Sequence, residues 1–176
     1  MSDKTSLYAP LLVETAWEVC NQVGGIYTVV RSKVPEIIDK WGGQYCMIGP
    51  LLHTKLPAEF EEVFQYDDDF GRAVLDMRKL GFELHYGRWL TDGKPKVVLI
   101  SPMQVYDKLK EIRTQLLHDH KINIFSPDDL LQQVICFGHL VAEFFRVLEK
   151  NAEGGNIIAH FHEWMTGMPI SYIKKE

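Results

Sequence analysis

The chain has 176 residues and a net charge of −5, with 46% hydrophobic and 24% charged residues. This length and composition are typical of a single soluble globular domain. The acidic balance argues against nucleic acid or an anionic membrane as a partner, because both select a basic protein face. No apolar run reaches the length of a membrane span, and the first residues are polar rather than signal-like. We therefore expect a cytoplasmic protein.

Strands and helices are predicted to alternate in the first part of the chain. An apolar run at 11–14 predicts a strand, and a loop leads from it to Gly24-Gly25. Apolar residues at helical spacing then predict a helix over 26–41, in which Pro35 is expected to introduce a kink or a new start. The apolar run at 45–48 predicts a second strand.

The next stretch is less regular. Residues 51–69 are interpreted as a surface connection, and the acidic run at 67–69 within them as a solvated loop. A short helix is expected over 74–80. Alternation of apolar and polar residues over 82–86 predicts a strand with one wetter face, near a sheet edge.

A hairpin and two helices are expected after that. The pair Asp92-Gly93 is a strong hairpin-turn signal and leads into an apolar strand at 96–100. Helical patterns follow over 105–117 and 128–150. Ser126 is the expected N-cap of the second helix, because its hydroxyl can accept a hydrogen bond from a free backbone N–H.

The last predicted elements are a buried strand that begins at Ile157 and a helix over 165–175. Strands that alternate with helices predict an α/β fold, here a Rossmann-like, open, largely parallel sheet flanked by helices. We expect a polar N-terminal tail at 1–10 and a domain over 11–176.

Gly24-Gly25 is the first candidate site, because it lies between a strand and the start of a helix. Glycine allows the backbone to approach a ligand, and a helix N-terminus favours an anion such as phosphate. The structural alternative is a tight turn without a ligand, which would explain the same two glycines. The pair is neither the dinucleotide fingerprint nor a P-loop, since the other residues of those motifs are absent.

Tyr86-Gly87-Arg88-Trp89 is the second candidate and comes just beyond the predicted strand at 82–86. Arg88 could bind phosphate, and Trp89 could stack on a sugar. An arginine packed over a tryptophan on an exposed loop is the structural alternative.

The third candidate is His160-Phe161-His162-Glu163-Trp164, at the end of the last apolar strand. Two histidines that alternate along a strand could hold a metal ion. Alternatively, Trp164 could stack on a sugar while His162 and Glu163 bind its hydroxyl groups. Two structural histidines and a half-buried tryptophan remain a third interpretation. If the strands are parallel, all three candidate segments reach the same edge of the sheet.

Four segments of the chain match a set of signature motifs. They are Glu14-Thr15-Ala16-Trp17-Glu18-Val19-Cys20-Asn21-Gln22-Val23-Gly24-Gly25-Ile26-Tyr27-Thr28-Val29, Ile48-Gly49-Pro50, Tyr86-Gly87-Arg88-Trp89-Leu90 and Ala159-His160-Phe161-His162-Glu163-Trp164-Met165-Thr166-Gly167. These segments resemble the motifs of eukaryotic-type glycogen synthases, which are retaining glycosyltransferases of family 3. They occur in family order between about Leu11 and Gly167, so chance agreement is very improbable.

The resemblance implies a GT-B glycosyltransferase with two Rossmann-like domains. This chain would be part of the N-terminal, acceptor-side domain, and the C-terminal donor domain would be absent from it. Such enzymes transfer glucose from UDP-glucose to the non-reducing end of an α-1,4-glucan in glycogen synthesis, and they use no metal or other cofactor. The fragment alone would be inactive, and the full-length protein could be a homo-oligomer.

Carried over residue by residue, the resemblance places Gly24 and Gly25 under the phosphates and glucose of the donor. It places His162, Glu163 and Trp164 in the cleft on the acceptor side. Gln22 takes the position of a basic residue that approaches the UDP phosphates in the family. Glutamine offers amide donors but no charge. The donor is therefore expected to be UDP-glucose or another nucleotide-glucose.

Two other functions fit parts of the sequence. A metal-dependent hydrolase would use His160 and His162, but it needs further ligands at strand ends. His85 is the only other histidine within a predicted strand. A non-catalytic glucan-binding module would instead bind oligosaccharide through Trp89 or Trp164, with no role for a nucleotide.

Overall fold

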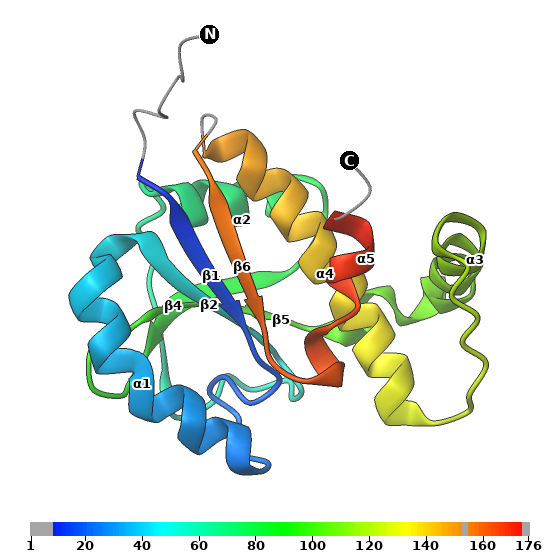
Figure 1. Ribbon diagram of the computed structural model, residues 1–176, viewed down its shortest axis with the longest axis horizontal. Helices are drawn as coiled ribbons and strands as arrows, with labels where there is room; N and C mark the ends of the chain where they lie inside the picture. Colours follow the sequence, from blue (N-terminus) through cyan, green and yellow to red (C-terminus); the bar gives the residue numbers. More distant parts are fainter. Residues whose placement is uncertain (1–8, 153–154, 174–176) are drawn as a thin grey trace, which may run out of the picture.

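The computed structural model describes residues 9–152 and 155–173. Most of the predicted tail at 1–10 and the last residues of the helix predicted over 165–175 lie outside these ranges. The central sheet has six strands in the order β3-β4-β5-β2-β1-β6. Figure 1 shows helices on both faces of this sheet. The strands are β1 (Leu11–Thr15), β2 (Tyr45–Pro50), β3 (Phe60–Glu62), β4 (Leu84–Trp89), β5 (Lys96–Ile100) and β6 (Ile157–Phe161).

The helices alternate with these strands as the sequence predicts. They are α1 (Gly25–Trp41), α2 (Asp69–Lys79), α3 (Leu109–His120), α4 (Asp129–Asn151) and α5 (Pro169–Ile173). Short 3₁₀ turns occur at η1 (Gly42–Gln44), η2 (Pro102–Lys108) and η3 (Trp164–Thr166). The α/β class and the Rossmann-like arrangement are therefore confirmed.

The sheet is mixed rather than uniformly parallel. β1 pairs in parallel with both β2 and β6, and β2 pairs in parallel with β5. β4 runs antiparallel to β5, and β3 runs antiparallel to β4. The hairpin at Asp92-Gly93 explains the reversal, because a connection this short can only join antiparallel strands.

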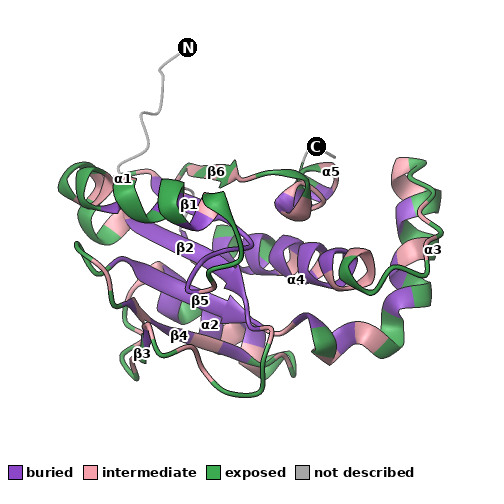
Figure 2. Ribbon diagram, turned by 90° about the horizontal axis from the view of Figure 1, so that it is seen from below, coloured by how far each residue is buried: buried purple, intermediate pink, exposed green. Residues whose placement is uncertain are grey.

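Two apolar cores fix the layers of the fold. Alternate residues of the central strands, such as Val13 and Ile48, face a large core shared with α2 and α4. The intervening residues, such as Met47 and Leu99, face a smaller core closed by α1. Figure 2 shows the buried central strands between these helices, with β6 more exposed at the edge. The prediction of a fully buried last strand was therefore wrong, since β6 has a strand neighbour on one side only among the described residues.

Helix α4 is the core helix of the larger layer. Within the described ranges it is the one helix long and apolar enough to cross a membrane. However, 61% of its apolar 18-residue stretch is buried inside the molecule. Its N-cap is Asp128, whose carboxylate accepts a hydrogen bond from the Leu131 N–H at 2.7 Å. The prediction of Ser126 was wrong by two residues. The Ser126 hydroxyl accepts from the N–H of Asp128 instead.

Two further predictions need correction. Helix α1 is continuous through Pro35, so the expectation that Pro35 could start a new helix was wrong. Pro35 and Arg31 are both exposed, so water can solvate the carbonyl that loses its helical partner. The helix predicted over 105–117 begins as the 3₁₀ turn η2, with non-helical backbone at Val105, and continues as α3.

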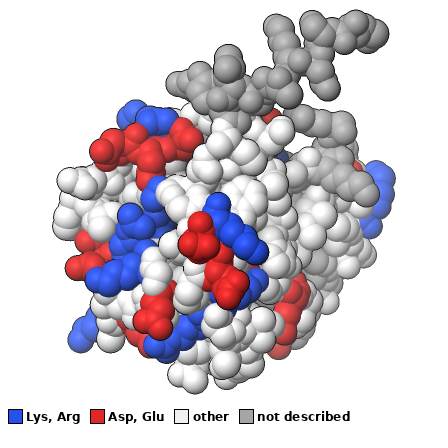
Figure 3. All heavy atoms as spheres, turned by 60° about the vertical axis from the view of Figure 1, so that its left-hand side comes forward, with Lys and Arg blue, Asp and Glu red and all other residues white. Residues whose placement is uncertain are grey.

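Surface charge is mixed on the side of the molecule where α1 lies. Figure 3 shows Lys and Arg side chains interspersed with Asp and Glu side chains on this face. Arg31 on α1, for example, lies 3.8 Å from a Glu59 carboxylate oxygen. Alternating signs of this kind do not produce the extended basic field that nucleic acid selects.

Candidate functional site

The carboxyl ends of β1 and β6 lie next to each other. The parallel register pairs Glu14 with His160 and Thr15 with Phe161, and the N–H of His162 donates to the carbonyl of Thr15 at 3.0 Å. Figure 1 shows the two strands side by side, blue and orange, with the loop to α1 and the turn into η3 leaving at the same end. Two of the three predicted site segments therefore converge, at the edge where open α/β sheets place ligands.

Glu14 lies at the centre of this edge and is only 1% exposed. One carboxylate oxygen, Oε1, contacts both the Lys33 ammonium from α1 and the Nε2 atom of His162. The other oxygen, Oε2, accepts a hydrogen bond from the Tyr45 hydroxyl. A buried carboxylate has to be compensated in this way, because desolvation of an isolated charge is expensive.

The electrostatic balance around Glu14 favours the charged carboxylate. Burial by itself raises the pKa, but hydrogen bonds with His162, Lys33 and Tyr45 outweigh burial and lower the pKa from 4.5 to about 2. Glu14 is therefore ionised at neutral pH and forms a fixed negative charge at the carboxyl edge of the sheet.

His160 completes a small group of metal-binding residue types. Its Nδ1 atom lies 3.7 Å from Glu14 Oε1, and its ring lies 4.4 Å from the His162 ring between centroids. Burial and the neighbouring His162 lower the pKa of His160 below its ordinary value. In the part of the chain that the structure describes, Glu14, His160 and His162 form one group whose ligand atoms all lie within 4.8 Å of one another.

The glycine turn before α1 is organised by Glu18. The Glu18 carboxylate, which is 4% exposed, accepts hydrogen bonds from the N–H groups of Gly24 at 2.6 Å, Tyr27 at 3.1 Å and Val23 at 3.3 Å. A carboxylate at this position satisfies free N–H groups and complements the positive end of the helix dipole. The anion-binding position predicted from the sequence therefore already contains an internal anion.

The two glycines differ in what surrounds them. A Cβ atom on Gly24 would lie 3.2 Å from the Glu18 carboxylate, whereas a Cβ on Gly25 would have no heavy atom within 4 Å. Gly24 is thus restricted by packing inside the turn. Gly25 faces open space, so contacts within the described chain do not require glycine there.

Gly49 in β2 has a packing role that explains the Ile48-Gly49-Pro50 motif. A Cβ atom at Gly49 would lie 2.7 Å from the Val19 Cβ and 3.0 Å from the Val19 carbonyl oxygen. The loop between β1 and α1 can cross β2 this closely because residue 49 has no side chain.

The turn after β6 exposes the predicted acceptor-side residues. Glu163 is exposed and has a φ of 60°, a left-handed conformation that non-glycine residues seldom adopt. Trp164 is 59% exposed, and His162 is half-buried against Glu14. The Thr166 hydroxyl donates to the His162 carbonyl at 2.5 Å and fixes the turn. Gln22 is exposed in the loop on the neighbouring strand.

Arg88 and Trp89 do not belong to this edge. β4 is antiparallel, so Arg88 pairs with Lys96 at the start of β5, near the amino ends of the parallel strands. Trp89 is 0% exposed, stacks edge-on against Tyr27, and donates its indole N–H to Glu59 at 3.1 Å. The predicted convergence of all three segments was therefore wrong for this one, and a fully enclosed ring has no free face for a sugar.

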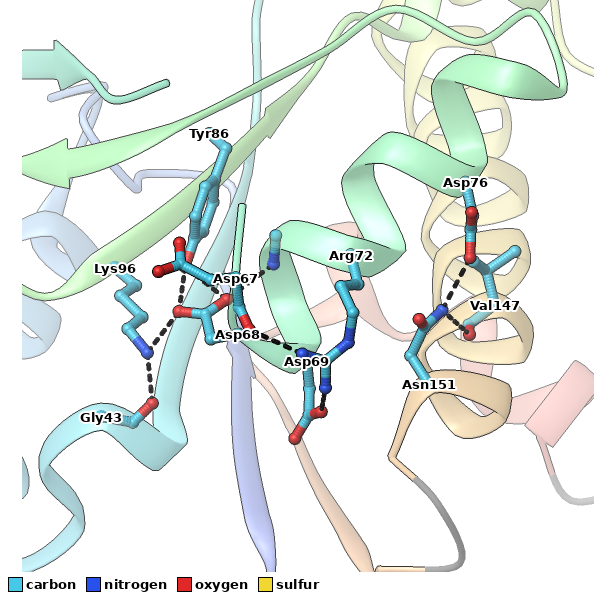
Figure 4. A network of polar contacts seen from close by, with 11 residues as sticks. Gly43, Asp67, Asp68, Asp69, Arg72, Asp76, Tyr86, Lys96, Val147 and Asn151 are labelled. Carbon is cyan, nitrogen blue, oxygen red and sulfur yellow. Dashed lines mark hydrogen bonds and ion pairs between the residues drawn. The ribbon is translucent and has the colours of Figure 1, made fainter. Parts of the chain in front are cut away.

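The acidic run at 67–69 is structural rather than a solvated loop. Asp68 caps α2 by accepting from the Gly71 N–H, and it also accepts from the Tyr86 hydroxyl and pairs with Lys96 (Figure 4). Burial raises the pKa of Asp68, but Lys96, Gly71 and Tyr86 outweigh it and hold the pKa below the usual value. This network connects α2 with β4 and β5 near the amino ends of the parallel strands.

Sequence reasoning missed Glu14, Glu18 and Lys33 as members of the site. A carboxylate at the end of an apolar strand was a usable signal for Glu14, because a buried charge requires a partner. Lys33 follows Val30 on the buried side of α1 by one helical turn, which was a weaker signal. The role of Glu18 depends on how the loop folds back, and no spacing rule indicated it.

Comparison with known proteins agrees with these motifs. The family model described as glycogen synthase matches residues 14–176, which is most of the chain. The chain belongs to the glycogen synthase family. The matched region includes both the glycine turn before α1 and the turn after β6.

Individual members of the glycogen synthase family are similar over nearly the whole chain. The "Glycogen [starch] synthase" of Neurospora crassa is 36% identical over 165 residues, covering 94% of this chain and 23% of that protein. The liver enzyme of Homo sapiens is 37% identical over 160 residues, with 91% and 23% covered. The Caenorhabditis elegans protein is 36% identical over 159 residues, with 89% and 24% covered. The chain thus spans about a quarter of the length of these curated relatives.

Proposed function

We propose that this chain forms part of the N-terminal, acceptor-side domain of a glycogen synthase with the two-domain GT-B arrangement. The full-length protein would transfer glucose from UDP-glucose, or another nucleotide-glucose, to the non-reducing end of an α-1,4-glucan, with retention of configuration. The observation that carries this proposal is the parallel pairing of β1 with β6. It brings the glycine turn and the His162–Trp164 turn to one edge of the sheet.

Each turn contributes different chemistry in this proposal. The phosphates of the donor approach the amino end of α1 from the side of Gly25, where a Cβ atom would meet nothing. Trp164, with 59% of its surface exposed, offers a ring on which a glucose unit can stack. His162 and Glu163 supply hydrogen bonds to sugar hydroxyl groups. Positioning of this kind is a main source of rate enhancement in group transfer.

The remaining expectations belong to the same proposal. Most of the groups that stabilise the leaving nucleotide would come from the rest of the protein, so the isolated chain would not catalyse transfer and would need no metal. The protein would be cytoplasmic, with no nucleic-acid or membrane partner, and homo-oligomeric at full length. The mixed charge on the face in Figure 3 supports the absence of a nucleic-acid partner.

An amide-shift titration of this chain with a maltooligosaccharide tests the proposal. We expect saturable shifts at Glu163 and Trp164, and their loss in Trp164→Ala. Phe64→Ala is the matched control, because Phe64 is 78% exposed and follows β3. β3 and β6 are the outermost strands on opposite sides of the described sheet, so Phe64 lies far from the Trp164 turn. A second titration with UDP should shift Gly25 rather than Arg88. Saturable sugar shifts centred on Trp89 or Arg88 would overturn the assignment.

A further inference from the structure

The cluster around Glu14 is arranged like a cation site. Three nitrogen atoms surround a single carboxylate oxygen, Glu14 Oε1: the Lys33 ammonium, His162 Nε2 and His160 Nδ1. The second oxygen, Oε2, is held by the Tyr45 hydroxyl. Oε1 therefore keeps a fixed direction toward the two imidazoles, as carboxylate ligands do when their other oxygen is hydrogen-bonded.

We propose that Glu14, His160 and His162 form a binding site for one divalent transition-metal ion, and that Lys33 competes with the ion for this site. Two imidazoles and one carboxylate are the ligand set that zinc and its neighbours in the first transition row favour. The inference does not depend on the proposed transferase activity, because ion binding alone tests it.

The distances fit an ion of this kind. Zinc–ligand bonds of roughly 2.0–2.1 Å place the ligand atoms of a tetrahedral site about 3.4 Å apart. His160 Nδ1 lies 3.7 Å from Glu14 Oε1, and all three ligand atoms lie within 4.8 Å of one another. His162 Nε2 and Glu14 Oε1 are in direct hydrogen-bond contact, so the ion would replace that hydrogen bond and side-chain rotation would move these two atoms apart. Rotation of His160 would bring the third ligand atom closer. His160 is exposed, so an ion can enter from solvent and keep a water molecule as its fourth ligand.

The Lys33 ammonium shows that the cluster already attracts a cation. Its Nζ atom pairs with Glu14 and lies 3.3 Å from His162 Nε2, the atom that would bind the metal. The two cations cannot share this position, because a protonated amine offers no lone pair and repels the ion. The Lys33 side chain is 28% exposed and comes from a helix on one face of the sheet. It can therefore rotate into solvent when an ion enters.

Titration of the whole chain with Zn²⁺ by calorimetry, and with Co²⁺ by visible absorption, tests the site. We expect one ion per chain and at least tenfold weaker binding in His160→Ala. The matched control is His118→Ala, which removes another exposed histidine outside the cluster and should leave the affinity unchanged. Cobalt bound to the cluster should give only weak ligand-field bands, whereas strong sulfur-to-cobalt bands would indicate binding by Cys20, Cys46 or Cys136.

Lys33→Met tests the competition. This variant keeps the length of the side chain and removes the charge, so the ion should bind at least tenfold more tightly than to the unmodified chain. Zn²⁺ should also raise the melting temperature of Lys33→Met more than that of the unmodified chain, because the ion restores charge compensation for Glu14. Equal binding by His160→Ala and the unmodified chain, or saturable binding by neither, would overturn the site. Unchanged affinity in a folded Lys33→Met would overturn the competition.

Discussion

The carboxylate of Glu18 lies 2.6 Å from the backbone N–H of Gly24 and occupies the amino end of α1. The turn that the sequence suggested as a phosphate cradle is therefore held in shape from inside the protein. A donor phosphate would approach next to Gly25, beside this internal anion, rather than replace it.

Glu18→Ala should lower the free energy of unfolding by about 1–3 kcal/mol, since three backbone N–H groups lose a buried charged acceptor. Urea unfolding measures this loss. Hydrogen exchange at the amides of Gly24 and Tyr27 should speed up in the same variant. Glu36→Ala, at an exposed position of α1, is the control and should change stability by no more than about 0.5 kcal/mol. Unchanged amide exchange in Glu18→Ala would contradict the role assigned to this carboxylate.

Gly25→Ala tests whether glycine is required at this position by the fold or by a bound ligand. Its Cβ atom would meet nothing within 4 Å, and alanine favours the first turn of a helix, so the variant should be as stable as the parent or about 0.5–1 kcal/mol more stable. Gly24→Ala should be less stable than Gly25→Ala, because its Cβ would approach Glu18 at 3.2 Å. UDP binding, measured by amide shifts, should weaken in Gly25→Ala if phosphate approaches there. Full UDP affinity in a stable Gly25→Ala would remove Gly25 from the donor site.

Glu14 should make the protein sensitive to acid. Its pKa falls from 4.5 to about 2 on folding, so the unfolded chain takes up a proton first as the pH is lowered. The stabilisation is fully present above the unfolded pKa and is lost as the pH falls from about 4.5 to about 2. It corresponds to about 3 kcal/mol. Urea unfolding at several pH values measures how the free energy of unfolding depends on pH. Glu14→Gln should flatten this dependence in this range, whereas Glu36→Gln should not.

Trp89 and Trp164 should respond to substitution in opposite ways. Trp89→Ala empties a fully buried site and frees Glu59 from its indole partner, so stability should fall by about 3–5 kcal/mol. Trp164→Ala, at an exposed turn, should change stability by about 0.5 kcal/mol or less. Thermal unfolding followed by circular dichroism compares the two. A large loss in Trp164→Ala would mean that this side chain is a packing residue rather than a ligand contact.

The order of strands and helices could be predicted from periodicity, because each central strand is a short apolar run between turn signals. β1, β2 and β5 appear within two residues of their predicted bounds. The direction of β4 could also have been predicted from the sequence, because the Asp92-Gly93 hairpin requires that β4 and β5 are antiparallel. The prediction of three converging segments did not apply this constraint to Arg88 and Trp89.

The composition of the site was predicted only in part. The turn at His162–Trp164 has a dense group of polar and aromatic residues, which local sequence can indicate. The partners of Glu14 could not be identified in the same way, because Glu14 and His162 are 148 positions apart and meet only through strand pairing. The three-residue strand β3 was missed for a similar reason. Its pairing with β4 decides its structure, and its own pattern is too short to indicate a strand.

The pairing of β1 with β6 also has a consequence for how the molecule is made. β1 is the first described strand and β6 the last, so their contact closes a loop that contains nearly all of the fold. Loops of this length close late, after local helices and hairpins have formed. During synthesis, β1 remains an open edge, and Glu14 lacks His162, until β6 has left the ribosome. Addition of β6 to the described sheet and assembly of the Glu14 cluster are therefore one event.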